Sequence, residues 1–218
     1  MENKRRNFII SGILLLVAIV FTILVKTVDV KAVGVNGTNI GFATSNQLVF
    51  ETTGVNMMWY DITHYLEVVP VLTVMAFAII GFVQLVKRKS ILKVDKEIML
   101  LGAFYVAVVA LYVFFEKVII NYRPTLIDGL LEASYPSSHT LMAIFICGSG
   151  VLVNKKLFDN KLTKVINYIL IIALTLTVVG RLISGVHWLT DIVGGIIISS
   201  CLLMLFYSLL DMIPKEEN

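Results

Sequence analysis

The chain has 218 residues, of which 58% are hydrophobic and only 15% are charged. A soluble domain carries about a quarter charged residues, so the composition excludes an ordinary water-soluble protein. The net charge of +3 gives no indication of nucleic-acid binding. Several apolar runs reach the roughly 20 residues that a helix needs to cross a bilayer, whereas a membrane β-barrel would show short alternating segments. We therefore expect an all-α integral membrane protein.

In chain order, six apolar segments are long enough to be membrane-spanning helices. We expect them at residues 7–25, 68–86, 98–115, 135–153, 165–181 and 187–210. The first segment follows the basic stretch NKRR and could be a secretory signal, but its apolar run is long and no A-x-A cleavage pattern follows it. We therefore expect it to be retained as the first helix of a six-helix bundle.

The connection between the first two spans, at about residues 26–67, is the longest in the chain. Gly and Asn in GVNGTNIGFATSN indicate turns, so we expect an irregular external loop that contains a short helix. His64 in this loop is expected to be a surface residue. The sequence has no internal repeat, so we expect one membrane-embedded domain over residues 1–218, with a motif-bearing core at about 98–211.

The basic residues predict how the chain is oriented in a cell membrane. They concentrate in the N-terminal MENKRR, in KRKSILKVDKE between the second and third spans, and in NKKLFDNKLTK between the fourth and fifth. Cytoplasmic segments of membrane proteins are enriched in Lys and Arg, so we expect these three segments in the cytoplasm. Six spans then place both termini inside. Asp159 is expected on the cytoplasmic side and Gly129 on the extracytoplasmic side.

Polar and ionisable residues gather at the ends of the spans that this topology places outside. Such residues in or beside a membrane span are costly and mark a functional site by default. They are Lys117 and Arg123 after the third span, Ser137, Ser138 and His139 at the start of the fourth, Arg181 at the end of the fifth, and His187 and Asp191 at the start of the sixth. Helices that alternate in direction bring all of these ends to one extracytoplasmic interface.

Each residue of this cluster also has an ordinary structural interpretation. Lys117 and Arg123 could be interfacial cations that extend toward water. The serines after Pro136 could cap a helix. His187 and Asp191, four residues apart on one helix face, could form a buried hydrogen bond. All of these interpretations would have to hold at once to explain the cluster, so a shared site is the better hypothesis.

The residue types in the cluster suit phosphoryl transfer through a histidine. Lysine and arginine can clamp an anion, and Arg matches the oxygens of a phosphate. Serine hydroxyls and the free N–H groups of a helix start add donors. A histidine with a carboxylate partner can act as a nucleophile, and a second histidine can protonate a leaving group. The sequence has no carboxylate cluster for a metal, and Cys147 and Cys201 lack metal-ligand spacing. We therefore expect no metal and no cofactor.

The stretches YPSSHT and GRLISGVHWLTD resemble the type 2 phosphatidic acid phosphatases, relatives of the vanadium haloperoxidases. That family has a Lys…Arg-Pro element, a Pro-Ser-x-His element, and an Arg followed by His after five residues and by Asp after three more. The third element is present as Arg181, His187 and Asp191, and the second begins at Pro136 and ends at His139.

The first element departs from the family pattern. Five residues separate Lys117 from Arg123, where the family usually has six, so that Glu116 stands in the lysine's place. Lys117 has a long side chain, which could still reach the same phosphate.

The resemblance implies a mechanism and a substrate class. It implies that His187 attacks phosphorus to form a phosphohistidine, that Asp191 holds its ring, and that His139 protonates the leaving oxygen. The phosphate ligands that it implies are Lys117, Arg123, Ser137, Ser138 and Arg181. The substrate would be a lipid phosphate in the bilayer, such as undecaprenyl diphosphate, phosphatidylglycerol phosphate or phosphatidic acid.

Two other functions remain open at this point. A lipid phosphotransferase would use the same phosphohistidine but pass the phosphoryl group to another lipid or a sugar. A lipid transporter or lipid-binding protein would place polar residues along a path at mid-membrane depth, whereas these gather at one interface. Haloperoxidase activity is not expected, because the related peroxidases are soluble.

Overall fold

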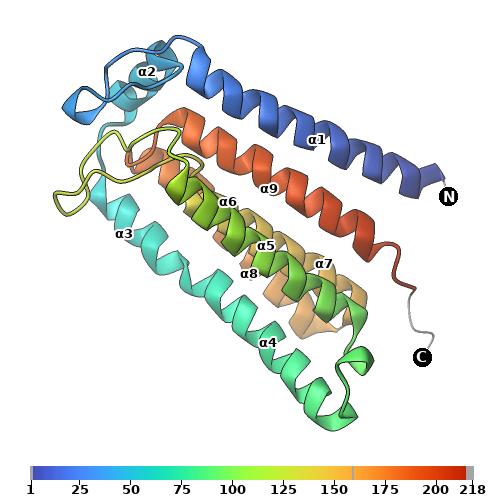
Figure 1. Cartoon of the computed structure of the whole chain (residues 1–218). Helices are drawn as coiled ribbons and strands as arrows, with labels where there is room; N and C mark the ends of the chain where they lie inside the picture. The colour runs from blue at the N-terminus through green and yellow to red at the C-terminus, as the bar shows by residue number, and fades with distance from the viewer. Residues whose placement is uncertain (1, 159, 215–218) are drawn as a thin grey trace.

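The computed structural model describes residues 2–158 and 160–214, which form a bundle of long helices (Figure 1). In chain order the helices are α1 (Glu2–Thr27), α2 (Ala43–Thr53), α3 (Met57–Leu66), α4 (Val68–Arg88), α5 (Lys96–Lys117), α6 (Ser138–Met142), α7 (Gly148–Leu157), α8 (Lys161–Ile183) and α9 (Leu189–Leu210). Short 3₁₀ turns lie at Val35–Gly37 and Ile91–Lys93. These residues contain no strand, so the all-α prediction is confirmed.

Six helical segments are long and apolar enough to cross a membrane. They are Asn3–Thr27, Met57–Arg88, Lys96–Lys117, Ser138–Leu157, Lys161–Ile183 and Leu189–Leu210. Large apolar side chains such as Leu16, Phe82 and Ile172 are exposed on their outer faces, where a bilayer would cover them. The predicted six-helix membrane bundle is confirmed, although the second span begins earlier than expected because α3 runs almost directly into α4.

The fourth span contains an irregular turn. Residues Ala143–Cys147 form a π-helical turn that joins α6 to α7 without breaking the helix. A π turn is wider than an α turn and accommodates an additional residue. The part of this span at the site and the part in the middle of the bundle therefore follow different helical registers.

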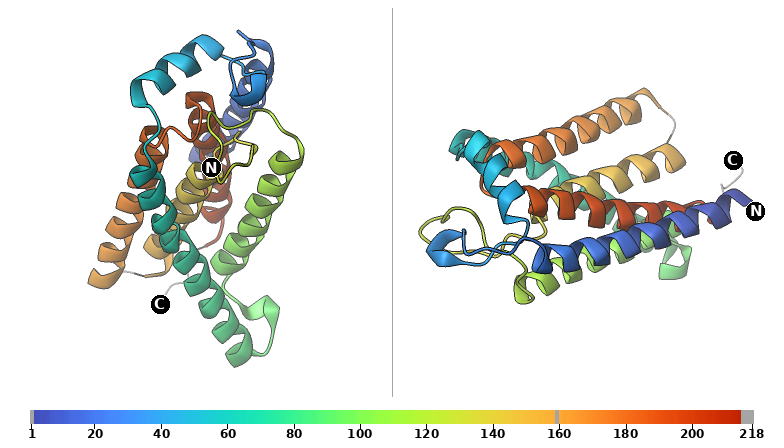
Figure 2. Two further views of the ribbon diagram at one scale, coloured as in Figure 1. Left: turned by 90° about the vertical axis from the view of Figure 1, so that its left-hand side faces the viewer. Right: turned by 90° about the horizontal axis from the view of Figure 1, so that it is seen from above.

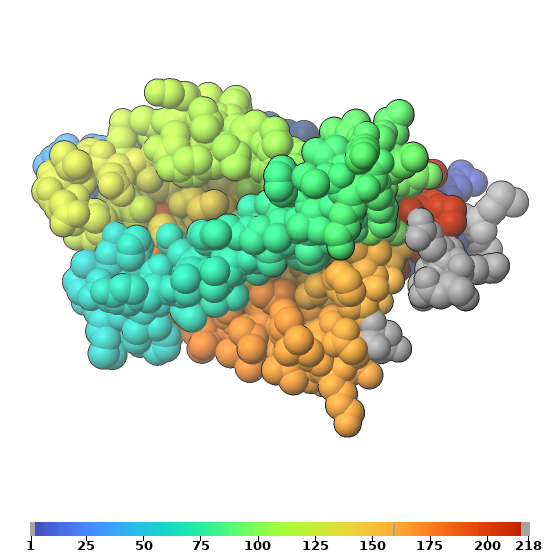
Figure 3. Space-filling view, turned by 90° about the horizontal axis from the view of Figure 1, so that it is seen from below, coloured from blue at the N-terminus to red at the C-terminus, as the bar shows by residue number. Residues whose placement is uncertain are grey.

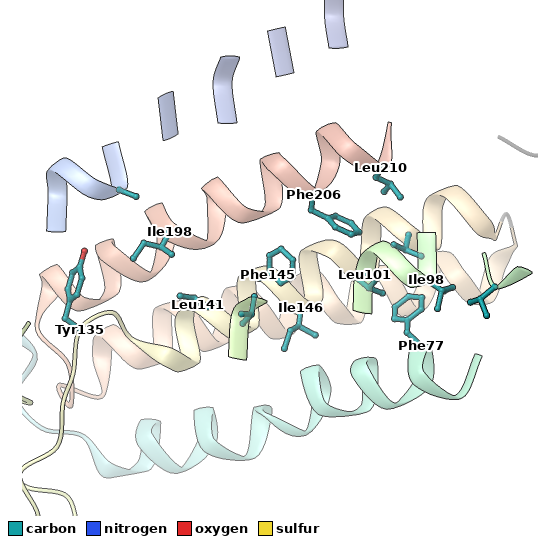
Figure 4. Packing of buried hydrophobic residues seen from close by; sticks show 14 of the residues in the cluster. Phe77, Ile98, Leu101, Tyr135, Leu141, Phe145, Ile146, Ile198, Phe206 and Leu210 are labelled. Carbon is teal, nitrogen blue, oxygen red and sulfur yellow. The ribbon is translucent and has the colours of Figure 1, made fainter. Parts of the chain in front are cut away.

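Aliphatic side chains together with several aromatic rings fill the centre of the bundle (Figure 4). The ring of Phe145 stacks on Phe104 of α5, with 5.8 Å between centroids, and meets Phe206 of α9 edge to face at 6.1 Å. These contacts hold the third, fourth and sixth spans together. Cys147 and Cys201 are buried and unpaired, as expected of small apolar residues.

The start of α1 and the end of α9 lie at one end of the bundle, and α2 and the 118–137 loop lie at the other (Figures 1 and 2). α1 packs along α9, where the Ser11 and Ser208 hydroxyl oxygens are 3.4 Å apart. The start of α1 and the end of α9 thus lie away from the end of the bundle that carries the motifs. Asp159, expected in the cytoplasm, lies outside the described residues.

The segment between the first two spans is more ordered than predicted. In place of an irregular loop with one short helix, it forms α2 and α3 and attaches to the helices of the motif. The amide of Asn46 donates to Thr190 Oγ1 (3.0 Å) and accepts from the Thr190 N–H (3.1 Å) at the start of α9. The N–H of Asn56 donates to the Ser184 carbonyl (2.9 Å) after α8. Hydrogen bonds to residues far along the chain therefore order this segment, which its turn-rich sequence alone would not do.

Candidate active site

The serines of YPSSHT start the fourth span against the first turn of α9. Ser137 caps α6, because its Oγ accepts from the Thr140 N–H (3.4 Å), and its own N–H donates to the Asp191 carbonyl (3.0 Å). Two glycines of α9 allow the close approach: a Cβ on Gly195 would lie 3.1 Å from the Ser137 carbonyl oxygen, and a Cβ on Gly194 would lie 2.4 Å from the ring of Tyr135. The predicted helix cap is therefore present and also joins two motif elements.

Asp191 is fully buried in the first turn of α9, behind His187. Its Oδ2 accepts from the Trp188 N–H (2.9 Å), and its Oδ1 accepts from the Asn121 side chain (3.2 Å). The same Oδ2 is 3.7 Å from Nδ1 of His187. The carboxylate is thus fixed by hydrogen bonds and faces one nitrogen of the histidine ring.

The other ring nitrogen of His187 faces Arg123, whose Nη1 is 3.3 Å from Nε2. Arg123 is itself held by Glu132, with 2.9 Å between Nε and the carboxylate oxygen. Burial lowers the pKa of His187 well below its usual range, and the charges of Arg123 and Arg181 lower it further. The ring is therefore neutral near pH 7, and Nε2 offers a lone pair toward an arginine that can bind an anion.

His139 and Arg181 converge on one carboxylate, that of Glu67. Nε2 of His139 contacts Oε1 of Glu67, and Nη2 of Arg181 is 3.5 Å from the same oxygen. Arg181 is fully buried, and its guanidinium lies 4.9 Å from the centre of the Tyr60 ring. Its Nε and Nη1 are buried without a hydrogen-bond partner among the described residues. Glu67 thus satisfies one nitrogen of this buried guanidinium, and the other two are left able to donate to a bound anion.

A cavity of about 540 Å³ opens between α5, the 118–137 loop and α6. Its lining brings together Arg123, Ser138, His139 and His187. A smaller cavity of about 220 Å³ lies between α4 and α6 and is lined by Glu67, His139 and mainly apolar side chains. The two cavities share His139 and Met142, so a polar chamber and an apolar groove meet at His139.

Lys117 is the predicted site residue that the structure does not bring into this cluster. It is exposed at the end of α5 and is not among the residues that line the larger cavity, whereas the neighbouring Glu116 is. This placement matches the one-residue departure of the sequence from the family spacing.

Three residues of the site were missed in the sequence, namely Glu67, Asn121 and Glu132. Glu67 directly precedes the second span expected from the sequence, where an acidic residue is a signal in itself, but it belongs to no motif. Asn121 and Glu132 lie in the 118–137 loop, and their partners follow from the path of that loop rather than from spacing.

A metal-binding set was also not expected. His64, Glu67 and His139 place one ligand atom each within 4.8 Å of one another. Two histidines and a carboxylate suit a zinc ion. The guanidinium of Arg181 lies against the same Glu67 oxygen, however, and its positive charge opposes a cation at this position.

Comparison with known proteins agrees with this geometry. A solved structure described as the first transmembrane PAP2-type phosphatidylglycerolphosphate phosphatase from Bacillus subtilis is similar over 95% of this chain and 98% of its own, with a TM-score of 0.63 and 18% sequence identity. At 18% sequence identity, this similarity is evidence for the fold alone. No curated protein matches the sequence. The family model of the PAP2 superfamily matches residues 98–214, more than half of the chain and all three motif elements. The chain therefore belongs to the PAP2 superfamily.

Proposed function

We propose that this protein is a lipid phosphate phosphatase that acts through a phosphohistidine on His187. The observation that carries the proposal is the presence of His187 and His139 in one cavity, with Asp191 on one side of the His187 ring and Arg123 on the other. Membership of the PAP2 superfamily supports it.

In the first step, Nε2 of neutral His187 attacks phosphorus, and the bond between phosphorus and the lipid oxygen breaks. His139 donates a proton to that oxygen, so the lipid leaves as an alcohol, or as a monophosphate when the substrate is a diphosphate. Asp191 accepts from Nδ1 of His187 and stabilises the positive charge that the ring gains. The 3.7 Å between these atoms shortens in the complex, as catalytic contacts commonly do.

In the second step, water attacks phosphorus and gives a proton to His139, the bond from phosphorus to His187 breaks, and inorganic phosphate is released. Charge builds on the phosphoryl oxygens in both steps, so fixed cations and donors stabilise the transition states. The proposed phosphate ligands are Arg123, Arg181, Ser137 and Ser138, without Lys117, which is exposed and does not line the cavity.

A phosphorylated lipid fits the surroundings of His139 better than a water-soluble ester. The apolar groove beside His139 would hold an acyl or prenyl chain whose phosphate lies in the polar cavity. Candidate substrates are phosphatidylglycerol phosphate, phosphatidic acid and undecaprenyl diphosphate. The similar Bacillus subtilis protein is described as a phosphatidylglycerolphosphate phosphatase, which makes that lipid the first to test.

The test is phosphate release by the purified protein in detergent, from these three lipids and from a soluble phosphate ester, with EDTA present. We expect turnover of at least one lipid, faster than that of the soluble ester, and inhibition by vanadate. An absolute requirement for Mg²⁺ would contradict the mechanism. Transfer of the phosphoryl group to an added lipid alcohol, without release of phosphate, would identify a phosphotransferase instead.

We further propose that the whole chain is one domain, with both termini in the cytoplasm and the site outside. The test compares Leu130→Cys, in the 118–137 loop, with Leu92→Cys, between α4 and α5, since both side chains are well exposed. The native Cys147 and Cys201 are buried, so the thiol reagent should label them little and the signal should come from the introduced cysteine. An impermeant thiol reagent should label Leu130→Cys in intact cells and Leu92→Cys only after permeabilisation. The reverse pattern would invert the topology.

A further inference from the structure

Glu67 lies at the junction of α3 and α4, outside the residues that the family model matches. Its carboxylate is half-buried and faces three side chains from three other positions in the fold. It contacts Nε2 of His139, lies 3.5 Å from Nη2 of Arg181, and lies 3.9 Å from Nδ1 of His64. Figure 3 shows the face along which α3 and α4 run, with the 118–137 loop beside α3 at one end. A residue outside the motifs thus touches two residues within them.

This contact occupies the atom of His139 that the proposed reaction needs. Nδ1 of His139 lies 3.4 Å from the hydroxyl of the neighbouring Ser138, so Nε2 is the nitrogen left to protonate a leaving oxygen. Nε2 contacts Glu67 instead. The same carboxylate lies at one arm of Arg181, while the other two nitrogens of that guanidinium are buried without partners among the described residues. The carboxylate therefore stands where a phosphoryl oxygen would bind.

We propose that Glu67 is a further residue of the phosphate-binding site, whose carboxylate is the resident anion that an incoming phosphate displaces from His139 and Arg181. This inference rests on the proposed function. The carboxylate balances the buried charge of Arg181 in the free protein, and it competes with the substrate for the same donors.

The surroundings allow the Glu67 side chain to move without moving α3. His64, which is exposed, offers the carboxylate a second partner on the solvent side. The main chain of Glu67 stays anchored, because its N–H donates to the His64 carbonyl (3.1 Å) and its carbonyl accepts from the Val71 N–H (3.2 Å). Displacement therefore requires rotation of one side chain rather than rearrangement of a helix.

The experiment measures binding of orthovanadate and of inorganic phosphate by calorimetry, on the full-length protein in detergent with EDTA. The variants are Glu67→Gln, which removes the charge, Glu67→Asp, which keeps the charge but shortens the side chain, and the control Asp61→Asn. Asp61 is an exposed carboxylate on α3. Unlike charges near a protein surface interact by a few kcal/mol at contact distance, and each 1.4 kcal/mol is tenfold in affinity.

We expect Glu67→Gln to bind both anions about tenfold more tightly than the native protein, after allowance for the partial exposure of the carboxylate. The KM for a lipid phosphate should fall in parallel. Glu67→Asp should lie between the two, and Asp61→Asn should equal the native protein. Melting temperatures show whether each variant is folded, and Glu67→Asp keeps the comparison possible if Glu67→Gln does not fold.

Three results would overturn the proposal. Unchanged or weaker anion binding in Glu67→Gln, with a lower kcat and the same KM, would mean that the carboxylate assists His139 rather than yielding to phosphate. In a parallel titration without EDTA, zinc that blocks anion binding in the native protein but not in His64→Ala would identify a metal site. If the native protein neither binds vanadate nor releases phosphate, the proposed function is wrong, and the displacement of Glu67 by phosphate fails with it. The first two results, in contrast, leave the proposed function standing.

Discussion

The segment of residues 28–67 and the motif-bearing stretch of residues 117–191 meet at the same end of the bundle but contribute different things. The motif-bearing stretch supplies histidines, arginines and serines that face a cavity. The 28–67 segment supplies hydrogen bonds to the main chain and hydroxyls beside the site, through Asn46 and Asn56, and the carboxylate of Glu67. The motif-bearing stretch thus carries the groups that we propose to perform the chemistry, and the 28–67 segment, Glu67 apart, carries groups that hold them in place. Mutations in the motif-bearing stretch should therefore lower turnover, whereas mutations in the 28–67 segment such as Asn46→Ala should mainly lower stability.

The largest expected effect is in the motif-bearing stretch. His187→Ala removes the proposed nucleophile, so turnover should fall by at least about 10³-fold and no acid-labile phosphoenzyme should form. The protein should still bind vanadate, because Arg181 and the serines remain. Rapid quench with a radiolabelled lipid phosphate measures the phosphoenzyme. Phosphohistidine trapped in this variant would show that another residue is the nucleophile.

The next effect depends on the leaving group. His139→Ala should slow release from a lipid alkoxide by about 10²–10⁴-fold, because a general acid is lost. The loss should be much smaller with p-nitrophenyl phosphate, whose leaving group needs no proton. The ratio of the two rates is the measurement. Equal losses with both substrates would exclude His139 as the acid.

A moderate effect is expected in the 28–67 segment, and it concerns stability. Asn46→Ala leaves the Thr190 N–H without its partner and the Thr190 hydroxyl with Asn121 as its remaining donor, so the free energy of unfolding should fall by about 1–3 kcal/mol. Turnover per folded molecule should change far less than in His187→Ala. Thermal unfolding in detergent and active-site titration separate the two quantities, with the adjacent Gln47→Ala as the control. Activity lost without any loss of stability would place Asn46 in the chemistry.

The smallest effect is expected at Lys117, which is exposed and apart from the cavity. Lys117→Ala should change kcat/KM by less than about threefold, as expected of an exposed charge, whereas Arg123→Ala should lower it by at least tenfold, as loss of a buried charged contact does. A large loss in Lys117→Ala, with Arg123→Ala as the reference, would show that its side chain reaches the phosphate after all.

The sequence predicted the parts of this protein that depend on local pattern. Apolar runs predicted all six spans, because a bilayer requires a fixed length of helix. The spacing predicted His187 and Asp191 on one helix face, which is wrong, because α9 begins at Leu189 and His187 lies in the turn before it; the two side chains still face each other, with 3.7 Å between Nδ1 and Oδ2. The order of the 28–67 segment was not predicted, because it follows from hydrogen bonds to residues far along the chain, as between Asn46 and Thr190. Glu67 was missed for the same reason: its partners are defined by packing, not by spacing.

The π-helical turn at Ala143–Cys147 has a consequence for how this chain can vary. Such a turn is equivalent to a one-residue insertion within an α-helix. A regular α-helix through the same residues would rotate His139 by about 100° relative to the lower half of the span, so that His139 and the core contacts could not both face inward. The wide turn absorbs this rotation. The span is therefore constrained by angle as well as by bilayer thickness: insertions and deletions should be tolerated in the loops, and a single deletion should be tolerated within this turn, where it restores a regular helix, but not elsewhere between His139 and the core.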